Sequence, residues 1–456
     1  MSSSPGNRVI VVGAGIAGLA AGHALSRRGF SVKILEATSR VGGRMTTDRV
    51  DGFVIDRGAQ FLSSEYGLLR AMARELGLEA SLQPASPWSG VVRDARVRRI
   101  RAGDPFSPWR SGLLSFPAWL RLGWRLGRLA RTQTARPLND YSQWSDCDIE
   151  TADVWGRREF GPTTTDYLIE PLLQGFYFQE TETTSRALAQ TVLAFGAHRS
   201  RTLAMAGGLG WLPTALATTL DIALATPAIA LIVEPDAVTV VTNETRLVAD
   251  HVVLATTASV ANRLFPTADE IERRLLATDY SANLNVALMT RPEFRLPASL
   301  NAVYGLLVPH RERRHVAAIG IESNKCRDRA ARGELFNVML AGNSSRDLMA
   351  WPEAEIVQAV LPEVERILPG ISAQIAAVRI YRRPEAEPLS PVGRAKDVRR
   401  YRERIAAAPN PRVLLAGDYL SMPFTEGAAE SGVWAAQTIL RAHEKRQTRP
   451  ADQVVK

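Results

Sequence analysis

Near the amino terminus, the hydrophobic positions fall into two short apolar runs separated by a longer segment. Arg8 to Val12 and Ser31 to Leu35 are runs rich in β-branched residues, which is typical of buried strands. Leu19 to Arg28, between them, has the length and composition of a helix. The pattern therefore predicts a strand–helix–strand unit at this end of the chain.

Further along the chain, the hydrophobic period changes twice. Residues 76–199 have a largely helical, arginine-rich pattern, whereas residues 280–345 alternate apolar and polar positions as sheet strands do. Asn283 to Met289 and Phe336 to Leu340 are examples of this alternation. A helical period resumes over residues 352–367. These segments predict an α/β domain joined to a mixed α+β domain.

A glycine-rich turn joins the first strand to the first helix. Gly13 permits the tight turn, Gly15 lets a pyrophosphate approach the backbone, and Gly18 lets helix and strand pack closely. The helix amino terminus then faces the phosphates with unpaired amides and the positive end of its dipole. The sequence predicts a dinucleotide site here, and Ile16 and Ala17 within the glycine-rich motif belong to it.

The second strand ends at Glu36, which is followed by Ala37, and we expect both residues at the same site. A carboxylate at this point can accept hydrogen bonds from the adenosine ribose hydroxyls. No arginine follows Glu36 directly, which argues against a 2′-phosphate on the ligand. FAD and NAD remain as alternatives on these residues alone.

A second cluster of small residues follows this unit. Gly42 and Gly43 permit a close backbone approach to a ligand, and Arg44 supplies a fixed cation suited to a phosphate. The alternative for Arg44 is an ordinary surface arginine. Near the other end of the chain, the apolar run Arg412 to Leu415 leads to a Gly-Asp pair at 417–418 and then to a helix start.

Together these motifs resemble those of the flavin-containing amine oxidase and protoporphyrinogen oxidase superfamily. The resemblance implies that the cofactor is FAD, with Asp418 beside its ribityl and phosphate groups and a helix start under the pyrimidine edge of the flavin. A helix amino terminus there would stabilise the negative charge of reduced flavin. The elements that carry the resemblance are Arg40-Val41-Gly42-Gly43-Arg44, Asp56-Arg57-Gly58-Ala59-Gln60, Ala416-Gly417-Asp418 and Glu426-Gly427-Ala428.

The resemblance also implies how the chain is divided. Residues 1–75, 200–268 and 385–456 would form a discontinuous FAD-binding domain of Rossmann-like α/β type. Residues 76–199 and 269–384 would form an α+β substrate-binding domain. The active site is expected at the junction of the two domains.

Departures from the family pattern bear on the cofactor bond and the substrate. Monoamine oxidases that bind FAD covalently use a cysteine upstream of the final helix, but residues 381–393 contain none, so we expect non-covalent FAD. Phe424 takes the place of one ring of the amine oxidase aromatic cage, whereas residues 388–393 offer no aromatic partner, which disfavours a simple primary amine. Tyr177 is a second candidate for the substrate pocket, with a core aromatic as the alternative. No catalytic residue is assigned.

Composition sets limits on class and location. The 456 residues exceed what one core usually supports, and the 46% of hydrophobic residues is ordinary for globular proteins. No run of 18 apolar residues and no secretory segment occur, and there are only two cysteines, so we expect a cytoplasmic protein. The six histidines show no metal-ligand spacing, and no metal is expected.

The net charge of +9 comes mainly from arginines spread along the chain without a nucleic-acid-binding module, so no nucleic-acid partner is expected. Residues 117–129 are the exception to this spread and predict an amphipathic helix. A basic helix of this kind can lie on a membrane surface or cover an internal cavity, and both alternatives remain open. Trp119, Leu122, Leu126 and Leu129 form its apolar row, and Arg121, Arg125 and Arg128 its basic row.

We expect an FAD-dependent oxidase or desaturase that removes a hydride from a hydrophobic small molecule, either cyclic or porphyrinogen-like, with oxygen as electron acceptor. An amine or amino-acid oxidase is the nearest alternative, and a redox-neutral flavin-dependent isomerase is another. A non-catalytic escort-type binding protein of the same fold is the alternative from a different class. The motifs at residues 42–44 and 417–418 argue against that last alternative.

Overall fold

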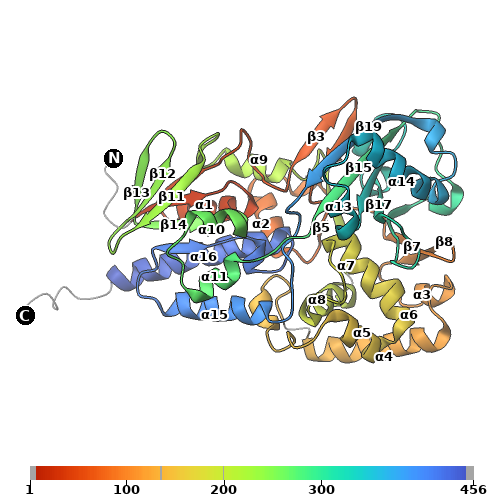
Figure 1. Cartoon of the computed structure of the whole chain (residues 1–456), viewed down its shortest axis with the longest axis horizontal. Helices are drawn as coiled ribbons and strands as arrows, with labels where there is room; N and C mark the ends of the chain where they lie inside the picture. Colours follow the sequence, from red (N-terminus) through yellow and green to blue (C-terminus); the bar gives the residue numbers. More distant parts are fainter. Residues whose placement is uncertain (1–6, 134–135, 199, 448–456) are drawn as a thin grey trace, which may run out of the picture.

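Two sheets organise the chain, and helices surround them (Figure 1). The computed structural model describes residues 7–133, 136–198 and 200–447. Residues 1–6 and 448–456, which were assigned to the FAD-binding domain, lie outside the described residues. The expected fold class, a Rossmann-like α/β part with a mixed α+β part, is confirmed.

The first sheet is parallel and has the strand order β10-β2-β1-β14-β20. Its middle strand, β1, pairs with β2 on one side and β14 on the other, as a buried parallel strand requires. The strands come from all three segments assigned to the FAD-binding domain. They are β1 (Arg8–Val12), β2 (Ser31–Leu35), β10 (Asp221–Ala223), β14 (His251–Leu254) and β20 (Val413–Leu415).

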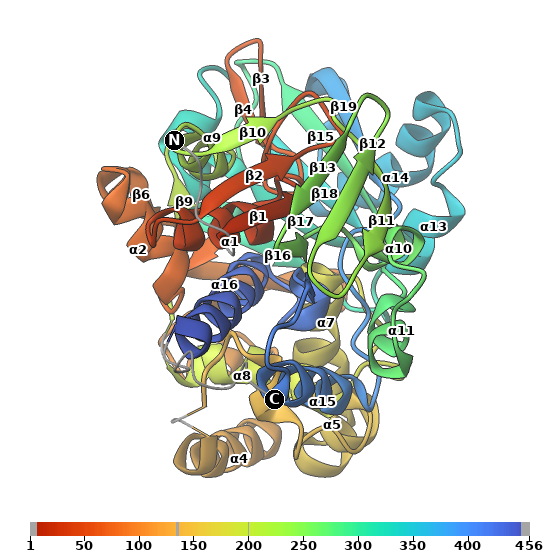
Figure 2. The same cartoon turned by 90° about the vertical axis from the view of Figure 1, so that its left-hand side faces the viewer.

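The predicted strand–helix–strand unit is confirmed as β1, α1 (Ile16–Ser26) and β2. α1 begins three residues before the predicted start, because the turn closes at Gly15, which caps the helix. α1 packs closely against α16 (Thr425–Gln447), as both views show (Figures 1 and 2). A Cβ on Gly432 of α16 would lie 2.0 Å from the Ala17 carbonyl oxygen, so only glycine allows this approach.

Other elements complete this part of the molecule. An antiparallel sheet, β11-β12-β13, lies at its edge, and the chain contributes short helices around it. The elements are α2 (Gly67–Glu75), α9 (Trp211–Ala217), β11 (Ala228–Val233), β12 (Val238–Thr242), β13 (Arg246–Ala249), α10 (Ala258–Leu264), α11 (Glu270–Leu276) and α15 (Arg394–Ala407).

The second sheet has seven strands in the order β19-β15-β18-β17-β16-β7-β8. All its pairs are antiparallel except β16 with β7. β15 is buried at every position rather than on alternate ones, because both of its faces are covered. The strands are β7 (Trp88–Arg93), β8 (Arg96–Arg101), β15 (Asn283–Thr290), β16 (Val303–Leu307), β17 (Val316–Ile321), β18 (Leu335–Leu340) and β19 (Ile375–Arg383).

The helical prediction for residues 76–199 is wrong at its beginning, where β6 (Leu82–Pro84), β7 and β8 form. Asp94 and Ala95, both with positive φ, make the tight turn of the β7–β8 hairpin. β8 is the edge strand of the sheet and carries four arginines, a composition that protects an edge from pairing with other chains.

From residue 107 onward the helical prediction is confirmed. These helices lie below the seven-stranded sheet in Figure 1, and α14 (Glu353–Ile367), also predicted, lies on the other side of it. They are α3 (Ser107–Arg110), α4 (Phe116–Gln133), α5 (Ala152–Phe160), α6 (Pro162–Thr164), α7 (Glu170–Tyr177) and α8 (Arg186–Ala197).

Small elements connect the two parts. They are β3 (Thr47–Val50), β4 (Phe53–Asp56), β5 (Leu62–Ser63), β9 (Thr202–Met205), α12 (Glu322–Lys325) and α13 (Gly342–Asp347). β3 pairs with β4, and β9 lies between β5 and β6.

Candidate active site

A cavity of about 420 Å³ lies at the carboxyl ends of four strands of the parallel sheet. Ligands of open α/β sheets bind at this edge, because the loops that follow the strands converge there. Most of the residues predicted to bind the cofactor line this cavity. They are Gly13, Gly15, Ile16, Ala17, Glu36, Ala37, Gly42, Gly43, Arg44, Ala59, Gly417, Asp418 and Ala428.

The three glycines of the first turn have different surroundings. Gly13 has a φ of +106°, and a Cβ there would lie 2.7 Å from the Ala255 carbonyl oxygen. A Cβ on Gly15 would meet no atom within 4 Å, because it would project into open space. Gly18 does not line the cavity: its Cβ would lie 1.9 Å from the Gly13 carbonyl oxygen, so its role is in packing.

The first helix presents its amino terminus to the cavity. Gly15 caps α1 without any side-chain hydrogen bond to the helix amides. Glu36 is fixed nearby, since its carboxylate accepts hydrogen bonds from the Ala14 amide at 2.8 Å and the Thr38 amide at 2.9 Å. A ligand here would meet helix amides at one point and a positioned carboxylate at another.

Arg44 joins the motifs from the two ends of the chain. Its Nη2 atom donates to Asp418 Oδ1 at 2.7 Å, and its Nη1 atom donates to the Ala386 carbonyl oxygen at 2.6 Å. Burial lowers the pKa of Arg44, but Asp418 and Glu387 outweigh burial and raise that pKa above its usual value. Arg44 is therefore a charged wall residue rather than an ordinary surface arginine.

Two residues of the carboxy-terminal helix start do not line the cavity, contrary to expectation. Glu426 turns away, and its two carboxylate oxygens accept hydrogen bonds from the Leu68 and Leu69 amides at 2.7 and 2.9 Å. It caps α2, because these amides lie in the first turn of that helix. A Cβ on Gly427 would lie 2.1 Å from the Met422 carbonyl oxygen, so Gly427 is required for packing.

A second cavity, of about 270 Å³, lies between the seven-stranded sheet and helices α7 and α8. Its wall is mainly apolar, as is usual for small-molecule sites. Tyr177, Phe424, Gly58 and Gln60 line it. Phe424 stacks on Tyr66 at 5.4 Å between ring centroids.

The two cavities meet at four residues that line both: Ala59, Glu387, Phe424 and Thr425. Glu387 is held by its backbone, which exchanges hydrogen bonds with Ser281. Burial raises the pKa of the Glu387 carboxyl to about 8, while Arg44 opposes the rise and Asp418 adds to it. Burial at this junction therefore favours the neutral form of the carboxyl.

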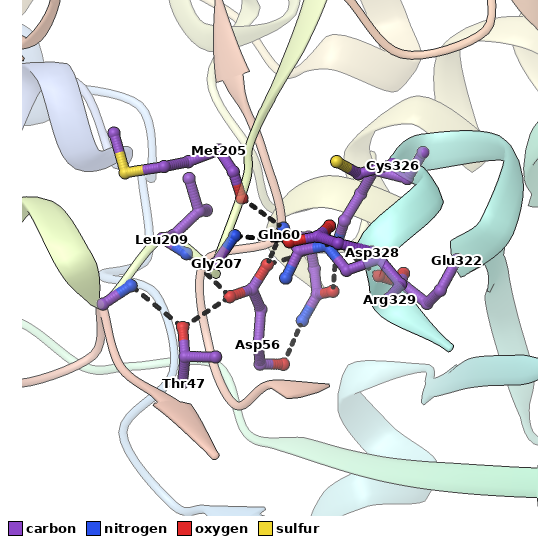
Figure 3. Close-up of polar contacts among 12 residues, drawn as sticks. Thr47, Asp56, Gln60, Met205, Gly207, Leu209, Glu322, Cys326, Asp328 and Arg329 are labelled. Carbon is purple, nitrogen blue, oxygen red and sulfur yellow. Dashed lines mark hydrogen bonds and ion pairs between the residues drawn. The ribbon is translucent and has the colours of Figure 1, made fainter. Parts of the chain in front are cut away.

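Gln60 belongs to a buried polar network rather than to the first cavity (Figure 3). Its side-chain amide donates to the carbonyls of Asp56 and Gly58 at 2.8 and 2.9 Å. Its Oε1 atom accepts from Asn337 at 3.1 Å and from Lys325 at 3.4 Å. These contacts occupy both ends of the side-chain amide, which gives Gln60 a structural role.

Gln60 contacts a cluster of four fully buried charged side chains through Lys325. The Asp56 carboxylate contacts Arg329 at 3.0 Å and Lys325 at 3.3 Å, and Lys325 contacts Glu322 at 2.6 Å. Two cations and two anions thus balance one another. Because Asp56 ends β4 and the other three follow β17, the cluster ties the cofactor side to the substrate side (Figure 3).

A model of the family described as flavin containing amine oxidoreductase matches residues 16–440. The chain belongs to this family. The family is described as one of flavin-containing oxidoreductases, which agrees with the flavin expected from the sequence motifs.

Relatives within the amine oxidoreductase family have different activities. Protoporphyrinogen oxidase 2 of Arabidopsis thaliana is 29% identical over 171 residues, which are 37% of this chain and 32% of that protein. Putrescine oxidase of Kocuria rosea is 48% identical over 106 residues, 23% of this chain and 22% of that protein. These alignments span a third or less of each relative.

The fold extends over nearly the whole chain. The crystal structure of cyclohexylamine oxidase from Brevibacterium oxydans IH-35A matches 97% of this chain and 100% of its own, with 20% identity and a TM-score of 0.76. At this identity the match describes the fold alone.

The residues that line the cofactor cavity are suited to FAD. The open space at Gly15 would receive a pyrophosphate, the α1 amides would bind its oxygens, and Glu36 lies where a ribose hydroxyl would donate. The isoalloxazine would reach the four shared residues. Neither Cys147 nor Cys326 lines the cofactor cavity. Within the described residues, no group of three or more His, Cys, Asp or Glu could hold a metal.

The sequence analysis missed Glu387, although the residue lies beside the segment searched for a second cage aromatic. Glu387 directly precedes residues 388–393, the segment that lacks a second cage aromatic. A glutamate between apolar residues and next to a proline carries no periodic signal. The available signal was the position of this charged residue within residues 381–393, the stretch that carries the covalent cysteine in monoamine oxidases.

Proposed function

We propose that this enzyme removes a hydride from a hydrophobic, cyclic substrate and passes it to non-covalently bound FAD. The observation that carries the proposal is the meeting of a dinucleotide-shaped cavity and an apolar cavity at Ala59, Glu387, Phe424 and Thr425. Ligand sites commonly have volumes of about 300–1,000 Å³. The substrate cavity measures about 270 Å³, which favours a compact ring system as substrate. A porphyrinogen is a larger member of the same class of cyclic substrates.

When bound, FAD supplies the hydride acceptor, and the residues of this chain supply positioning and a dry environment. The α1 amides and Arg44 would hold the phosphates, and Glu36 would orient the ribose. Phe424, stacked on Tyr66, would form one wall beside the reacting carbon. These roles are proposals from position, and each residue acts by contact with cofactor or substrate.

Glu387 would handle the proton that accompanies hydride removal. A group with a pKa near the working pH exchanges protons readily in either direction. The pKa of about 8 places Glu387 in this range. As a carboxyl it would donate a hydrogen bond to a substrate heteroatom, and as a carboxylate it would accept the proton that this atom releases.

Amine oxidation is a second candidate, and Glu387 is the observation that favours it. An ammonium group at the junction of the cavities would pair with the carboxylate, lowering the pKa of Glu387 and fixing the C–N bond beside the flavin. An incomplete aromatic cage argues the other way, because Phe424 is the one aromatic ring on the shared wall, and its stacking partner Tyr66 lines the substrate cavity alone. Both candidates place the same residues at the reacting carbon.

Anaerobic flavin bleaching tests the proposal. The yellow protein would be mixed without oxygen with cyclohexylamine, with uncharged cyclic alkenes and alcohols, with amino acids and with a porphyrinogen. We expect bleaching by one compact cyclic class, and hydrogen peroxide when oxygen is then admitted. Bleaching by porphyrinogen or amino acids alone would contradict the proposal of a compact cyclic substrate. Turnover only after reduction by dithionite would instead indicate the isomerase alternative.

The Glu387→Gln variant separates the two candidates. If the substrate is an amine, the variant loses the ion pair, and its bleaching rate should fall by at least about tenfold with FAD content unchanged. If the substrate is uncharged, the pH dependence of bleaching should disappear while its rate near neutral pH changes less. Unaltered rates at every pH would remove Glu387 from the reaction.

A further inference from the structure

Helix α4 has two apolar faces, only one of which is covered by the protein. Leu122 is buried, and Trp119 and Leu126 pack beside it against the helical core. Phe116, Leu120 and Trp124 recur every four residues on another face and are between 51% and 60% exposed. An amphipathic helix on a globular core needs only the first face, so the second calls for another partner.

Neighbouring aromatic residues enlarge this second face. Phe106 and Trp109, from the segment that contains α3, are 46% and 42% exposed. Trp109 lies 5.6 Å from Phe116 between ring centroids, and Trp119 Nε1 anchors the cluster by donating to the Pro105 carbonyl oxygen at 2.7 Å. We define the aromatic face as Phe106, Trp109, Phe116, Leu120 and Trp124. Ring contacts with one another and with Trp119 fix Phe106, Trp109 and Phe116 within this face.

The aromatic face lies in the most basic part of the chain. Residues 96–133 contain nine arginines and a single carboxylate, Asp104, while the whole chain has a net charge of +9. Part of the predicted basic row faces inward: Arg121 donates to the carbonyl oxygens of Arg158 and Glu159, and Arg125 pairs with Glu159 at 2.8 Å. Other arginines of this segment, such as Arg101 and Arg131, are exposed, and the exposed Arg110 lies 6.0 Å from the centroid of the Phe106 ring.

We propose that the aromatic face docks this enzyme on an anionic lipid bilayer. Tryptophan and phenylalanine side chains insert at the level of the lipid headgroups, and surrounding arginines are attracted to anionic lipids. α4 forms an edge of the molecule in both views, with nothing beyond it (Figures 1 and 2). No helix in the described part of the chain is long and apolar enough to span a bilayer, so the contact would be interfacial.

The charge of this region favours a bilayer over a second copy of the chain. A two-fold interface places the same surface against itself, which would bring two arginine-rich rims together. Like charges at such an interface are unfavourable, whereas anionic headgroups are complementary to them.

The alternative in which this helix caps the substrate cavity is not supported. No residue of α4 lines that cavity; α4 instead borders a separate cavity of about 280 Å³ against α5 and α8. β8, which precedes α3, carries Ile100 to the wall of the substrate cavity. One strand therefore leads from the docking region to the site where a hydrophobic substrate would bind.

Vesicle co-sedimentation of the flavin-loaded enzyme tests the proposal. We expect binding to phosphatidylcholine vesicles that contain phosphatidylglycerol, weaker binding to pure phosphatidylcholine, and release at high salt. The Leu120→Ser/Trp124→Ser variant should bind the mixed vesicles at least about tenfold more weakly, because the loss of two inserted side chains exceeds the 1.4 kcal/mol of a tenfold change.

Trp351→Ser is the matched control, since Trp351 is 44% exposed but lies next to α14, outside the aromatic face. The control should bind like the unchanged enzyme, and all variants should retain their flavin. Equal binding by the double variant, or no binding by the unchanged enzyme, would overturn the proposal. A dimer that the double variant converts to a monomer would overturn it as well, because the face would then be an interface between copies.

Discussion

Glu387 is the residue whose position and chemistry are most closely linked. It lies on the wall shared by the two cavities, and burial raises its pKa from 4.5 to about 8. A carboxyl whose pKa is higher in the folded protein stabilises the fold fully below its unfolded pKa. This contribution is lost as the pH rises through the folded value.

We therefore predict that Glu387→Gln reduces the loss of stability of the flavin-free protein between about pH 5 and pH 9. The neutral amide cannot ionise, so the stability of the variant relative to the unchanged protein should increase as the pH rises. Urea unfolding midpoints across this range measure the difference. Glu79→Gln, at an exposed site, is the control and should leave the profile as it is.

The buried cluster of Asp56, Glu322, Lys325 and Arg329 shows a different use of charge. Figure 3 labels Asp56, Glu322 and Arg329. Its members lie at 0% side-chain exposure, where each charge depends on its partners. Removing one cation would leave two anions with one compensating arginine.

Lys325→Met is expected to lower the free energy of unfolding by about 3–5 kcal/mol, because breaking a buried ion pair leaves an uncompensated charge. Lys33→Met breaks a surface pair with Asp221 and should cost less than about 1 kcal/mol. Chemical denaturation compares the two. Similar losses in both variants would show that the buried cluster contributes no more than a surface pair.

At the scale of elements, the six residues from Gly13 to Gly18, which form the turn after β1 and the start of α1, separate binding from packing. The Cβ position of Gly15 faces the open cavity, whereas that of Gly18 points into the Gly13 carbonyl. The same substitution should therefore have different consequences at the two positions.

Gly15→Val should fold with little loss of stability but fail to retain flavin, because its side chain would occupy the pyrophosphate position. Gly18→Val should be destabilised by several kcal/mol or fail to fold, since no small shift relieves a 1.9 Å contact with backbone. Thermal unfolding and the ratio of flavin to protein absorbance distinguish these outcomes. A yellow Gly15→Val protein would contradict the site.

Local pattern predicted the elements whose own residues determine them. The β1–α1–β2 unit and α14 follow from periodicity and glycine spacing. β8 was missed because its two apolar residues, Val97 and Ile100, are three positions apart and give no strand alternation, and only its place at the sheet edge explains its arginines. Glu426 and Gln60 were placed at the cofactor because motifs give sequence position, whereas side-chain direction depends on α2 and on the charged cluster, distant in sequence.

At the scale of the whole molecule, the cofactor cavity is built from segments far apart in the chain. Arg44 donates hydrogen bonds to Ala386 and to Asp418, and both Arg44 and Asp418 line the cofactor cavity. A bound flavin would touch each segment at once. It should therefore stabilise the folded state as a whole.

Removal of FAD is expected to lower the free energy of unfolding by about 2.7 kcal/mol relative to protein held at a hundredfold excess over the dissociation constant. The melting temperature should rise again as FAD is restored. Differential scanning fluorimetry over a series of FAD concentrations measures this. A melting temperature that does not depend on FAD would contradict binding to the folded state.

The split origin of the parallel sheet also sets the order of events at the ribosome. β20 and α16 emerge about 400 residues after β1, which at about 5–20 residues per second corresponds to roughly 20–80 s. During this interval the nascent polypeptide has its glycine turn but lacks the wall opposite. We therefore expect cofactor capture to wait until β20 and α16 have emerged.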